Sequence, residues 1–428
     1  MIHILLSIIL LVVHTHLPAQ EILVERKLTL QQSVDTALNN RKEVLLAQHE
    51  QSLSKERTKE ATSFKYPKID LIFGYSMVDT DRPMVLPPHF GSALIDRKTP
   101  GDYYITRVSL WQHIYSGGRY SSNLKLAESN LYRSEMQLRI VTNDITFEVK
   151  KAFYRLFAIQ QKIDVYNLLI SSANELMKGV KQKKPADEIE GQRFIITMER
   201  ERNVLINEKG KKSLDFLNTL GIELNTSFLL EQKFEPLPEK YDLNSLLGWA
   251  FKNRPEPKQI QAQEEIDALS LKLSMTMRHP TVSLGAHYES PGETLNFDRK
   301  NWNAMLNMDL PIFDGWASWS RIRQKHIQVE QNKLRRRDVE DSIRLGVRKT
   351  YQNYNFWLNE VNTRKSQLEE KAPLLLALNR LDLQSAISSL RLYLMLKLGY
   401  IDAVDEHLCS RAGIEHAIGK SLVAESIK

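Results

Sequence analysis

The chain has 428 residues, of which 42% are hydrophobic and 26% are charged, and its formal net charge is +7. This composition can form a sizeable apolar core, and it excludes an intrinsically disordered chain. The mean hydropathy of −0.37 excludes a bundle of transmembrane helices, because each such helix needs about 18 or more consecutive apolar residues. The basic residues are scattered in short clusters, which favours solvated helix faces over a nucleic-acid-binding surface.

One long apolar run, ILLSIILLVV, occupies residues 4–13, and the small-residue sequence Leu17-Pro18-Ala19 follows it. This pattern is typical of a secretory signal peptide, so we expect residues 1–19 to be removed before Gln20. No Lys or Arg precedes the run, and a buried N-terminal helix is therefore the alternative. The single cysteine, Cys409, excludes a disulfide framework, so an exported chain must be stabilised by a large core or by assembly.

The sequence contains two copies of one pattern. Leu30 and Ala37 recur as Leu243 and Ala250, at an offset of 213 positions (243 − 30 = 213). Residues 114–117 recur at 312–315, where the offset is 198 (312 − 114 = 198). The difference places 15 additional residues in the first copy (213 − 198 = 15), within a Pro- and Gly-rich loop at 79–102. We therefore expect a first structural repeat in residues 20–229 and a second in residues 230–428.

The pattern of each copy predicts one helix, two strands, a corner at glycine between the second strand and the next helix, and two long helices. In the first copy these segments are a helix at 30–65, strands at 67–78 and 103–115, and long helices at 118–183 and 187–220. In the second copy they are a helix at 243–278, strands at 280–289 and 302–313, and long helices at 316–380 and 385–420. Apolar or small residues recur every seven positions from Leu124 to Tyr166. A helix of about 60 residues is about 90 Å long, which predicts a coiled coil rather than a globular domain.

The four predicted strands alternate strictly between apolar and polar residues. Each run is about nine or ten residues long, the length of a tilted transmembrane β-strand. We expect Leu71, Leu284 and Leu306 to face lipid. An amphipathic soluble sheet that rests on the helices is the alternative, but helices of this length extend far beyond four strands. Aromatic residues at the strand ends are typical of interfacial girdles: Tyr75, Tyr104, Trp111, Tyr288 and Trp302.

Four strands cannot close a barrel in a membrane, because the smallest single-chain barrels have eight strands and open edges do not survive in lipid. Transmembrane strands in this chain therefore require several chains to share one barrel, and the long helices would continue it as a tube. The strand-to-helix corners would lie at Gly117, Gly118, Asp314 and Gly315, because glycine permits the backbone angles that such a corner needs. The polar sides of the strands supply the candidates for pore-lining residues: Asp70, Arg107, His287, Asn303, Asn307 and Asp309.

Five segments of the sequence resemble segments of the TolC-type outer-membrane efflux proteins. They are residues 28–40 (LTLQQSVDTALNN), 66–69 (YPKI), 114–119 (IYSGGR), 217–221 (LNTLG) and 310–315 (LPIFDG). The resemblance implies a mainly α fold with a small β part, in which three copies form a 12-stranded outer-membrane barrel continued by a periplasmic α-helical barrel. It also implies a passive exit duct that docks to a periplasmic adaptor protein and an inner-membrane pump.

The resemblance also implies that the far end of the tube is closed by polar and charged side chains where the paired helices turn. The candidates are Lys183, Asp187, Arg380 and Asp382, whose opposite charges would pair between neighbouring helices. The alternative is that they are ordinary solvated turn residues. The sequence departs from the family here, because the tips usually contain a glycine and these do not.

The motifs of enzyme chemistry are missing from the sequence: it contains no HExxH, no CxxC and no P-loop. His113, His279 and His287 lie near strand ends, where an interfacial role is favoured over metal binding. We therefore expect no enzymatic activity, no cofactor and no metal. A coiled-coil scaffold of the cell envelope remains the alternative to a channel, although it leaves the duplicated strands and corners unexplained.

Overall fold

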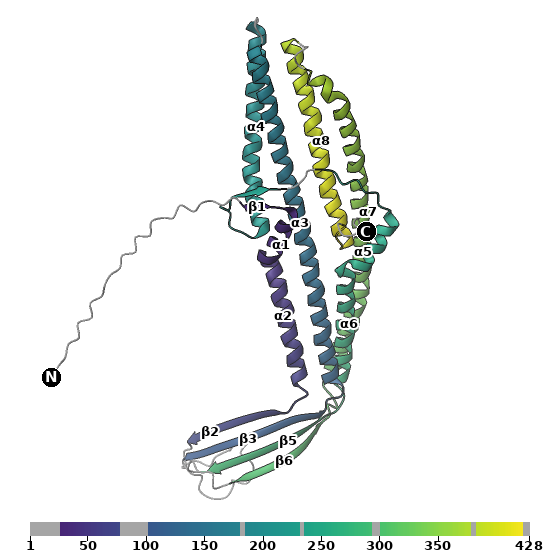
Figure 1. Cartoon of the computed structure of the whole chain (residues 1–428). Coiled ribbons are helices and arrows are strands. Elements are labelled where there is room, and N and C mark those ends of the chain that lie inside the picture. The colour runs from purple at the N-terminus through teal and green to yellow at the C-terminus, as the bar shows by residue number, and fades with distance from the viewer. Residues whose placement is uncertain are drawn as a thin grey trace, which may run out of the picture.

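The computed structural model describes residues 26–77, 102–179, 185–231, 235–292, 300–377 and 382–422. The long helices run along one common direction, and a sheet projects sideways from one end of the helical body (Figure 1). No helix in the described part of the chain combines the length and the apolar character needed to cross a membrane. The signal peptide expected at 1–19 lies outside the described residues, and so does the loop expected at 79–102, except for Asp102, which begins a strand.

The first helical segment is two helices, α1 (Leu30–Asn40) and α2 (Lys42–Ser63), rather than the single helix expected at 30–65. α1 begins with a capping box, in which Thr29 and Gln32 each accept a hydrogen bond from the other's backbone N–H. The break lies at Arg41, whose backbone is extended. Its guanidinium donates a 3.1 Å hydrogen bond to the carbonyl oxygen of Asn218, in the last turn of a later helix, so a tertiary contact stabilises the break.

The second half has the same break, between α5 (Leu243–Asn253) and α6 (Pro255–Thr276). Here Arg254 has a non-helical backbone, with φ of −59° and ψ of 138°, and its guanidinium donates to the carbonyl oxygen of Ala417 at 3.3 Å. Proline explains the position of this break, because the residue before a proline is disfavoured in the helical region. The expected helix at 243–278 is therefore also two helices.

Four long helices build most of the body: α3 (Arg119–Gly179), α4 (Pro185–Leu220), α7 (Ala317–Leu375) and α8 (Leu383–Ile418). α4 begins at a proline, which suits the first helical position because its missing N–H would have no partner there. α3 is the central helix and packs against α1, α2, α4, α6 and α8. Phe153 of α3, Phe216 of α4 and Val404 of α8 meet in the largest core cluster. The core is thus a row of interhelical seams rather than a globular centre.

A two-stranded parallel sheet closes over this core at mid-height, formed by β1 (Arg26–Leu28) and β4 (Phe228–Leu230). Leu28 is almost completely buried, and the Phe228 ring packs against the Phe216 ring at a tilt of 48°, with ring centroids 5.4 Å apart. The strands thereby attach the start of the described chain to the connection between the two halves.

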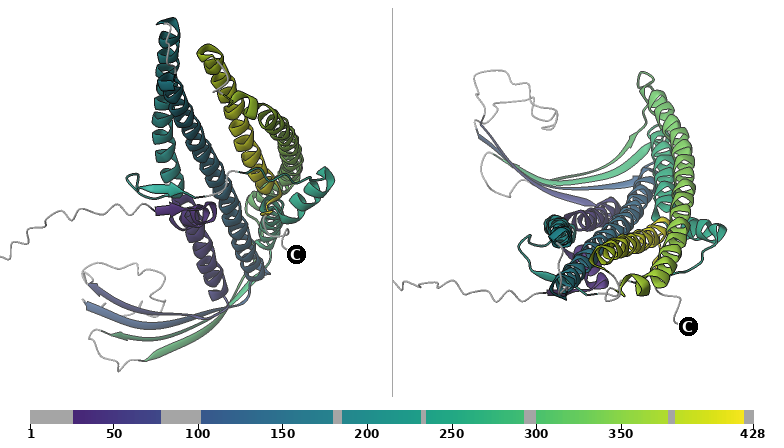
Figure 2. Two further views of the ribbon diagram at one scale, coloured as in Figure 1. Left: turned by 45° about the horizontal axis from the view of Figure 1, so that its top comes forward. Right: turned by 90° about the horizontal axis from the view of Figure 1, so that it is seen from above.

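The projecting sheet has four antiparallel strands, β2 (Lys68–Met77), β3 (Asp102–Tyr115), β5 (Thr281–Gly292) and β6 (Asn301–Asp309), in the order β2-β3-β5-β6. It is curved when seen along the helices (Figure 2). β6 ends four residues before the expected position 313, because Pro311 has no N–H to donate to a ladder. Within the described residues, β2 and β6 each pair on one side only, so both outer edges are open.

Elements of the two halves recur at two constant offsets. The bounds of α5 and α6 are those of α1 and α2 plus 213, and the bounds of α8 are those of α4 plus 198. The hairpins share one register as well. Leu71 lies opposite Val108 in the first hairpin, and the residues at the same offsets, Leu284 and Leu306, lie opposite each other in the second.

Candidate channel surfaces

One face of the four-stranded sheet carries all six residues expected to line a pore. Residues that lie directly opposite each other in a sheet point to the same side, and a row of such partners crosses all four strands. It runs through Asp70, Ser109, His287 and Asn303. Arg107, Asn307 and Asp309 lie an even number of residues from members of this row on their own strands, so they share its face. We call this side the polar face.

Two pairs of side chains on the polar face join neighbouring strands, and a third lies within β2. Arg107 Nη2 lies 2.6 Å from Glu289 Oε2, and both side chains are only about one-fifth exposed. His287 Nδ1 lies 3.0 Å from Ser109 Oγ, and Lys68 Nζ lies 3.4 Å from Asp70 Oδ1. The face therefore presents hydrogen-bonded polar groups of both signs, which is the character of a water-filled barrel interior.

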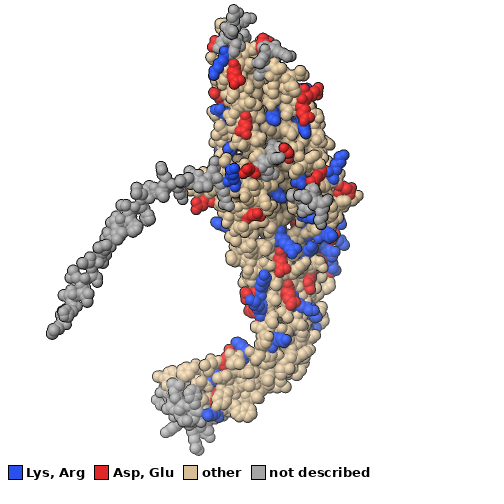
Figure 3. All heavy atoms as spheres, in the orientation of Figure 1, with Lys and Arg blue, Asp and Glu red and all other residues tan. Residues whose placement is uncertain are grey.

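The opposite face is apolar and uncovered. Leu71 and Leu306 are 72% and 68% exposed, values that a water-soluble sheet would reduce by packing against another layer. Few charged side chains appear on the sheet in Figure 3, whereas the helical body is covered with them. The exposed side chains of this apolar face include Ile69, Leu71, Phe73, Tyr75, Met77, Val108, Leu284, Tyr288, Trp302, Leu306 and Met308.

Four of the five aromatic residues expected at strand ends lie on the apolar face, but Trp111 does not. The ring centroids of Tyr75 and Tyr104 are 5.0 Å apart at the end of the sheet away from the helices. Trp111 lies opposite Gly285, on the polar face, where a Cβ on the glycine would come within 2.9 Å of the indole ring. The interfacial role expected for Trp111 is therefore wrong. Its position, two residues after Ser109, could have indicated this.

The two strand-to-helix corners share one backbone geometry with different residues. Gly117 and Gly118 have φ of 61° and 86°, and the corresponding Gly315 and Trp316 have φ of 65° and 70°. Trp316 is the only non-glycine residue with positive φ in the described part of the chain, although this conformation is costly for a bulky side chain. Trp316 stands in the sequence where the first copy has its second glycine, but the sequence did not predict that it would adopt a positive φ.

The side chain of Asp314 contacts the first turn of α7 at the second corner. Its carboxylate accepts hydrogen bonds from the backbone N–H of Ser318, at 2.8 Å, and from the Ser318 hydroxyl. These bonds lower the pKa of the Asp314 carboxyl below its usual value. From two residues before the N-cap, Trp316, Asp314 thus satisfies one backbone N–H group in the first turn of α7.

The helix tips hold the four candidates for a periplasmic gate. Lys183 and Arg380 lie outside the described residues, and Asp187 is placed only by its backbone in the first turn of α4. Asp382 is exposed and is the N-cap of α8, because its side chain accepts a hydrogen bond from Ser385 N–H. Hydrogen bonding from the Ser385 side chain, and then from its backbone N–H, lowers the pKa of the Asp382 carboxyl. The opposite-charge pairing of these residues stays a prediction.

Comparisons with known proteins agree on one family. Residues 33–183 match the family model of the outer membrane efflux protein. The outer membrane protein VceC from Vibrio cholerae has 12% sequence identity and a TM-score of 0.74, over 92% of this chain and 96% of that chain. The outer membrane channel CmeC from Campylobacter jejuni has 15% identity and a TM-score of 0.71, over 91% and 85%. Residues 33–183 therefore match the outer membrane efflux protein family, and the chain shares its fold with these solved outer-membrane proteins.

A third solved structure, the open state of the outer membrane channel MtrE from Neisseria gonorrhoeae, has 11% identity and a TM-score of 0.73, over 91% of this chain and 89% of that chain. No curated protein sequence matches the chain. As members of this family are outer-membrane channels with a periplasmic helical extension, the protein is placed in the outer membrane, with its helices in the periplasm.

Three basic residues of α3 form ion pairs with acidic residues of α8. Arg155 Nη1 lies 2.7 Å from Asp405 Oδ2, Lys162 Nζ lies 2.6 Å from Asp402 Oδ1, and Lys150 pairs with Glu415. Burial raises the pKa of the Asp405 carboxyl, while the Arg155 charge opposes that rise. The pairs join helices from different halves, and sequence reasoning missed them because their members lie far apart in the chain.

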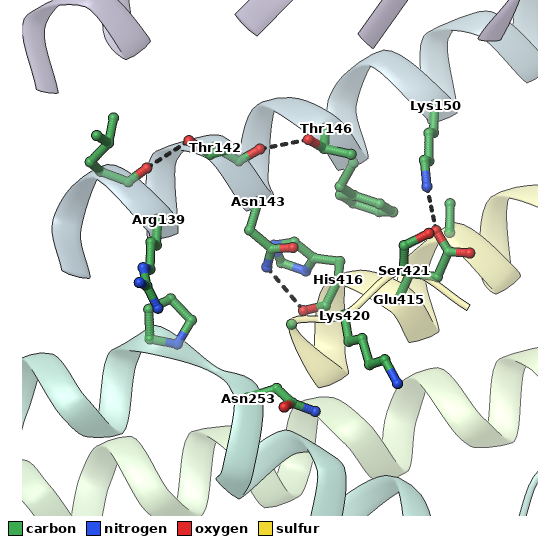
Figure 4. A pocket seen from close by; sticks show the side chains of 15 residues that line it. Arg139, Thr142, Asn143, Thr146, Lys150, Asn253, Glu415, His416, Lys420 and Ser421 are labelled. Carbon is green, nitrogen blue, oxygen red and sulfur yellow. Dashed lines mark hydrogen bonds and ion pairs between the residues drawn. The ribbon is translucent and has the colours of Figure 1, made fainter. Parts of the chain in front are cut away.

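A cavity of about 470 Å³ lies beside these pairs, where α3, α8 and the α5–α6 junction meet. Figure 4 shows that two of its polar groups already have partners: Lys150 bonds to Glu415, and Asn143 donates to the carbonyl oxygen of His416. The His416 ring in turn lies 2.7 Å from Asp144 Oδ1. No cluster of three potential metal ligands occurs within the described residues. The cavity is a crevice between the helices of the body.

Proposed function

We propose that this protein is the exit duct of a tripartite efflux system, and that three copies share one 12-stranded barrel. The observation that carries the proposal is the four-stranded sheet, which has one uncovered apolar face, one paired polar face and two open edges. Lipid would cover the apolar face, and the open edges would find their hydrogen-bond partners on neighbouring copies. Three times four strands exceeds the eight that the smallest barrels need.

The helices would continue the barrel as a periplasmic tube, built from the duplicated unit that begins at 20 and at 230. Asp70, Arg107, His287, Asn303, Asn307 and Asp309 would line the barrel lumen. Substrates would pass by diffusion once a pump has delivered them, which requires no enzymatic group and no cofactor in this chain. A periplasmic adaptor and an inner-membrane pump would be the partners at the helix tips, as the family resemblance implies.

Fractionation and conductance test this proposal against the coiled-coil scaffold. A channel sediments with outer membranes, runs in detergent as an oligomer that heat dissociates, and conducts ions in planar lipid bilayers. A scaffold is released by washing and conducts nothing. A protein that is monomeric in detergent and silent in bilayers would overturn the proposed duct.

The gate at the helix tips can be separated from the capping of α8 by two substitutions of Asp382. Asp382→Asn removes the charge but keeps a good N-cap, whereas Asp382→Ala removes both. We expect single-channel conductance to rise for Asp382→Asn, because an exposed ion pair holds a gate only weakly, by about 0–1 kcal/mol.

Arg380→Ala, which removes the opposite charge, should raise the conductance to a similar extent. A rise for Asp382→Ala alone would assign the effect to the loss of the cap. Unchanged conductance in all three variants would leave these residues as solvated turn residues. Because its pKa is lowered in the fold, the carboxylate of Asp382 stabilises the α8 N-terminus above its unfolded pKa, and this contribution is lost as the pH falls through the folded pKa.

A further inference from the structure

We propose that neighbouring copies recognise each other through two unlike faces, with α7 of one copy against α2 and α4 of the next. In the same contact, β6 pairs with β2 of the next copy in a register that puts Leu306 opposite Tyr75. This inference rests on the proposed trimer and assigns the residues that build it. Such head-to-tail contacts close into a ring when the rotation between copies is right.

The first support is a difference in burial between α7 and its counterpart α3. Leu334 and Ile327 of α7 are 65% and 58% exposed. The residues 198 positions earlier, Met136 and Ser129 of α3, are 2% and 6% exposed. α3 is covered on this side by α6, whereas no element in the described part of the chain covers α7 there. The large apolar residues on the uncovered helix indicate a missing partner.

The opposite edge of the chain shows the complementary difference. Leu53 of α2 is 45% exposed, whereas its counterpart Ile266 of α6 is 8% exposed. Higher in the body, Ile189 of α4 is 67% exposed, and its counterpart Ile387 of α8 is 4% exposed. Ile266 and Ile387 belong to helices that pack against α3 of the same copy. The counterpart of α3 is α7. The uncovered residues of α2 and α4 are thus those that an α7 from another copy would bury.

The contacts between α3 and α6 set the alignment of this interface. Arg133 Nη1 donates to Gln263 Oε1 at 2.7 Å, and Gln259 Nε2 donates to Gln137 Oε1 at 2.6 Å. Moving four residues forward along α3 therefore moves the contact four residues backward along α6, as expected for antiparallel helices. The same antiparallel alignment, carried over by the two offsets, puts Ile327 of one copy level with Ser54 of the next, directly beside Leu53. It also puts Gln331 within reach of Glu50.

The sheet gives an independent alignment. Val108 of β3 lies opposite Tyr288 of β5, and Arg107 lies opposite Glu289. Because both hairpins share one register, the same offsets predict the pairing across the open edges. Leu306 of β6 would lie opposite Tyr75 of the next copy, and Met305 opposite Ser76. A slip of one residue would turn the apolar face of one copy onto the polar face of its neighbour, so the faces restrict the register.

A charge swap tests the helical contact. We expect Ile327→Arg to abolish the oligomer in detergent, because the guanidinium would be buried against Leu53. The double variant Ile327→Arg with Leu53→Glu should restore it. The control is Leu168→Arg, since Leu168 of α3 and its counterpart Ser366 are both exposed and lie outside the proposed interface. Sedimentation measures the oligomer, and far-ultraviolet circular dichroism verifies that each variant has folded.

A disulfide tests the sheet register without disturbing the core. We expect the double variant Met305→Cys with Ser76→Cys to form covalent trimers on oxidation. The control pair is Met305→Cys with Ile72→Cys, which lies on the same face but four residues, or about 14 Å, along the strand. That distance is too long for a disulfide. Cys409 is buried and is retained in both variants.

The outcomes separate this inference from the proposed duct. A covalent trimer from the Ser76 pair and rescue by the charge swap would support the inference. An oligomer that survives Ile327→Arg, or that cross-links through Ile72 and not Ser76, would overturn the assigned contacts while leaving the duct in place. A wild-type protein that is monomeric and non-conducting would refute the duct itself.

Discussion

Gly117→Ala should lower the free energy of unfolding by about 2–5 kcal/mol, because two penalties add at this position. The backbone has φ of 61°, which an L side chain adopts only at a cost. An added Cβ would also lie 2.6 Å from the Cβ of His279, an atom that no side-chain rotation can move away. One strand or one helix would therefore have to shift.

Such a shift would break the contacts that hold the first corner against the end of α6. His279 Nδ1 lies 3.2 Å from the carbonyl oxygen of Gly117, and Arg119 donates to the carbonyl oxygen of Met277 at 3.0 Å. Urea unfolding of the protein in detergent, followed by circular dichroism and tryptophan fluorescence, measures the loss. We also expect less oligomer, since the corner orients the sheet against the helices.

Gly346→Ala is the matched control for this experiment. Gly346 lies inside α7, and a Cβ placed there would meet nothing within 4 Å. Alanine at a helical position should stabilise the fold by about 0.5–1 kcal/mol relative to glycine. Equal stability of Gly117→Ala and the wild type would mean that the corner does not have the backbone conformation described here.

The features that the sequence predicts well are those that follow from the regular spacing of apolar residues along a strand or helix. Strict alternation assigned Leu71, Leu284 and Leu306 to one side of the sheet, because successive residues of a strand must point to opposite sides. The long helices were predictable because proline is rare in them, and Pro373, near the end of α7, is tolerated by that helix. Their exact ends were not predictable, since α4 begins at Pro185 through a local preference that a heptad pattern does not report.

The features that the sequence does not predict depend on distant partners. The helix break at Arg41 needs the carbonyl group of Asn218, which lies 177 residues away. The ion pair between Arg155 and Asp405 likewise joins residues from different halves. Neither partner can be chosen before the helices are placed side by side. Positive φ at Trp316 falls in the same class, because no local pattern distinguishes that tryptophan from an ordinary first helical residue.

The candidate site residues fall into the same two classes, those predicted by regular spacing and those that depend on partners. The candidates on the strands are placed by period, and they share the polar face. The candidates at the helix tips were chosen by charge alone, and the one side chain among them that the structure describes, Asp382, has a local partner in Ser385. Charge in a turn predicts a cap at least as well as it predicts a gate, because Asp is among the preferred residues at helix N-termini.

Leu306→Arg should destabilise the folded oligomer in lipid vesicles by about 2–4 kcal/mol, the cost of arginine on the lipid side of a barrel at mid-bilayer. Leu306 lies on the apolar face opposite Leu284, so its replacement would put a guanidinium into hydrocarbon. Leu306→Ile keeps the apolar surface and the β-propensity, and it should leave stability unchanged within error. Urea titration of protein reconstituted in vesicles measures each difference.

Asn307→Arg is the control, because it places the same charge one residue further along the strand. Asn307 lies opposite Ser283 on the polar face. The same face already carries Arg107, which is paired with Glu289. Water on that side would solvate the new guanidinium, so the free energy of unfolding should change little, while the added positive charge should shift the ion selectivity of the channel toward anions. If Leu306→Arg and Asn307→Arg were tolerated equally, neither side of the sheet would face hydrocarbon. The apolar face would then be covered by protein rather than by lipid.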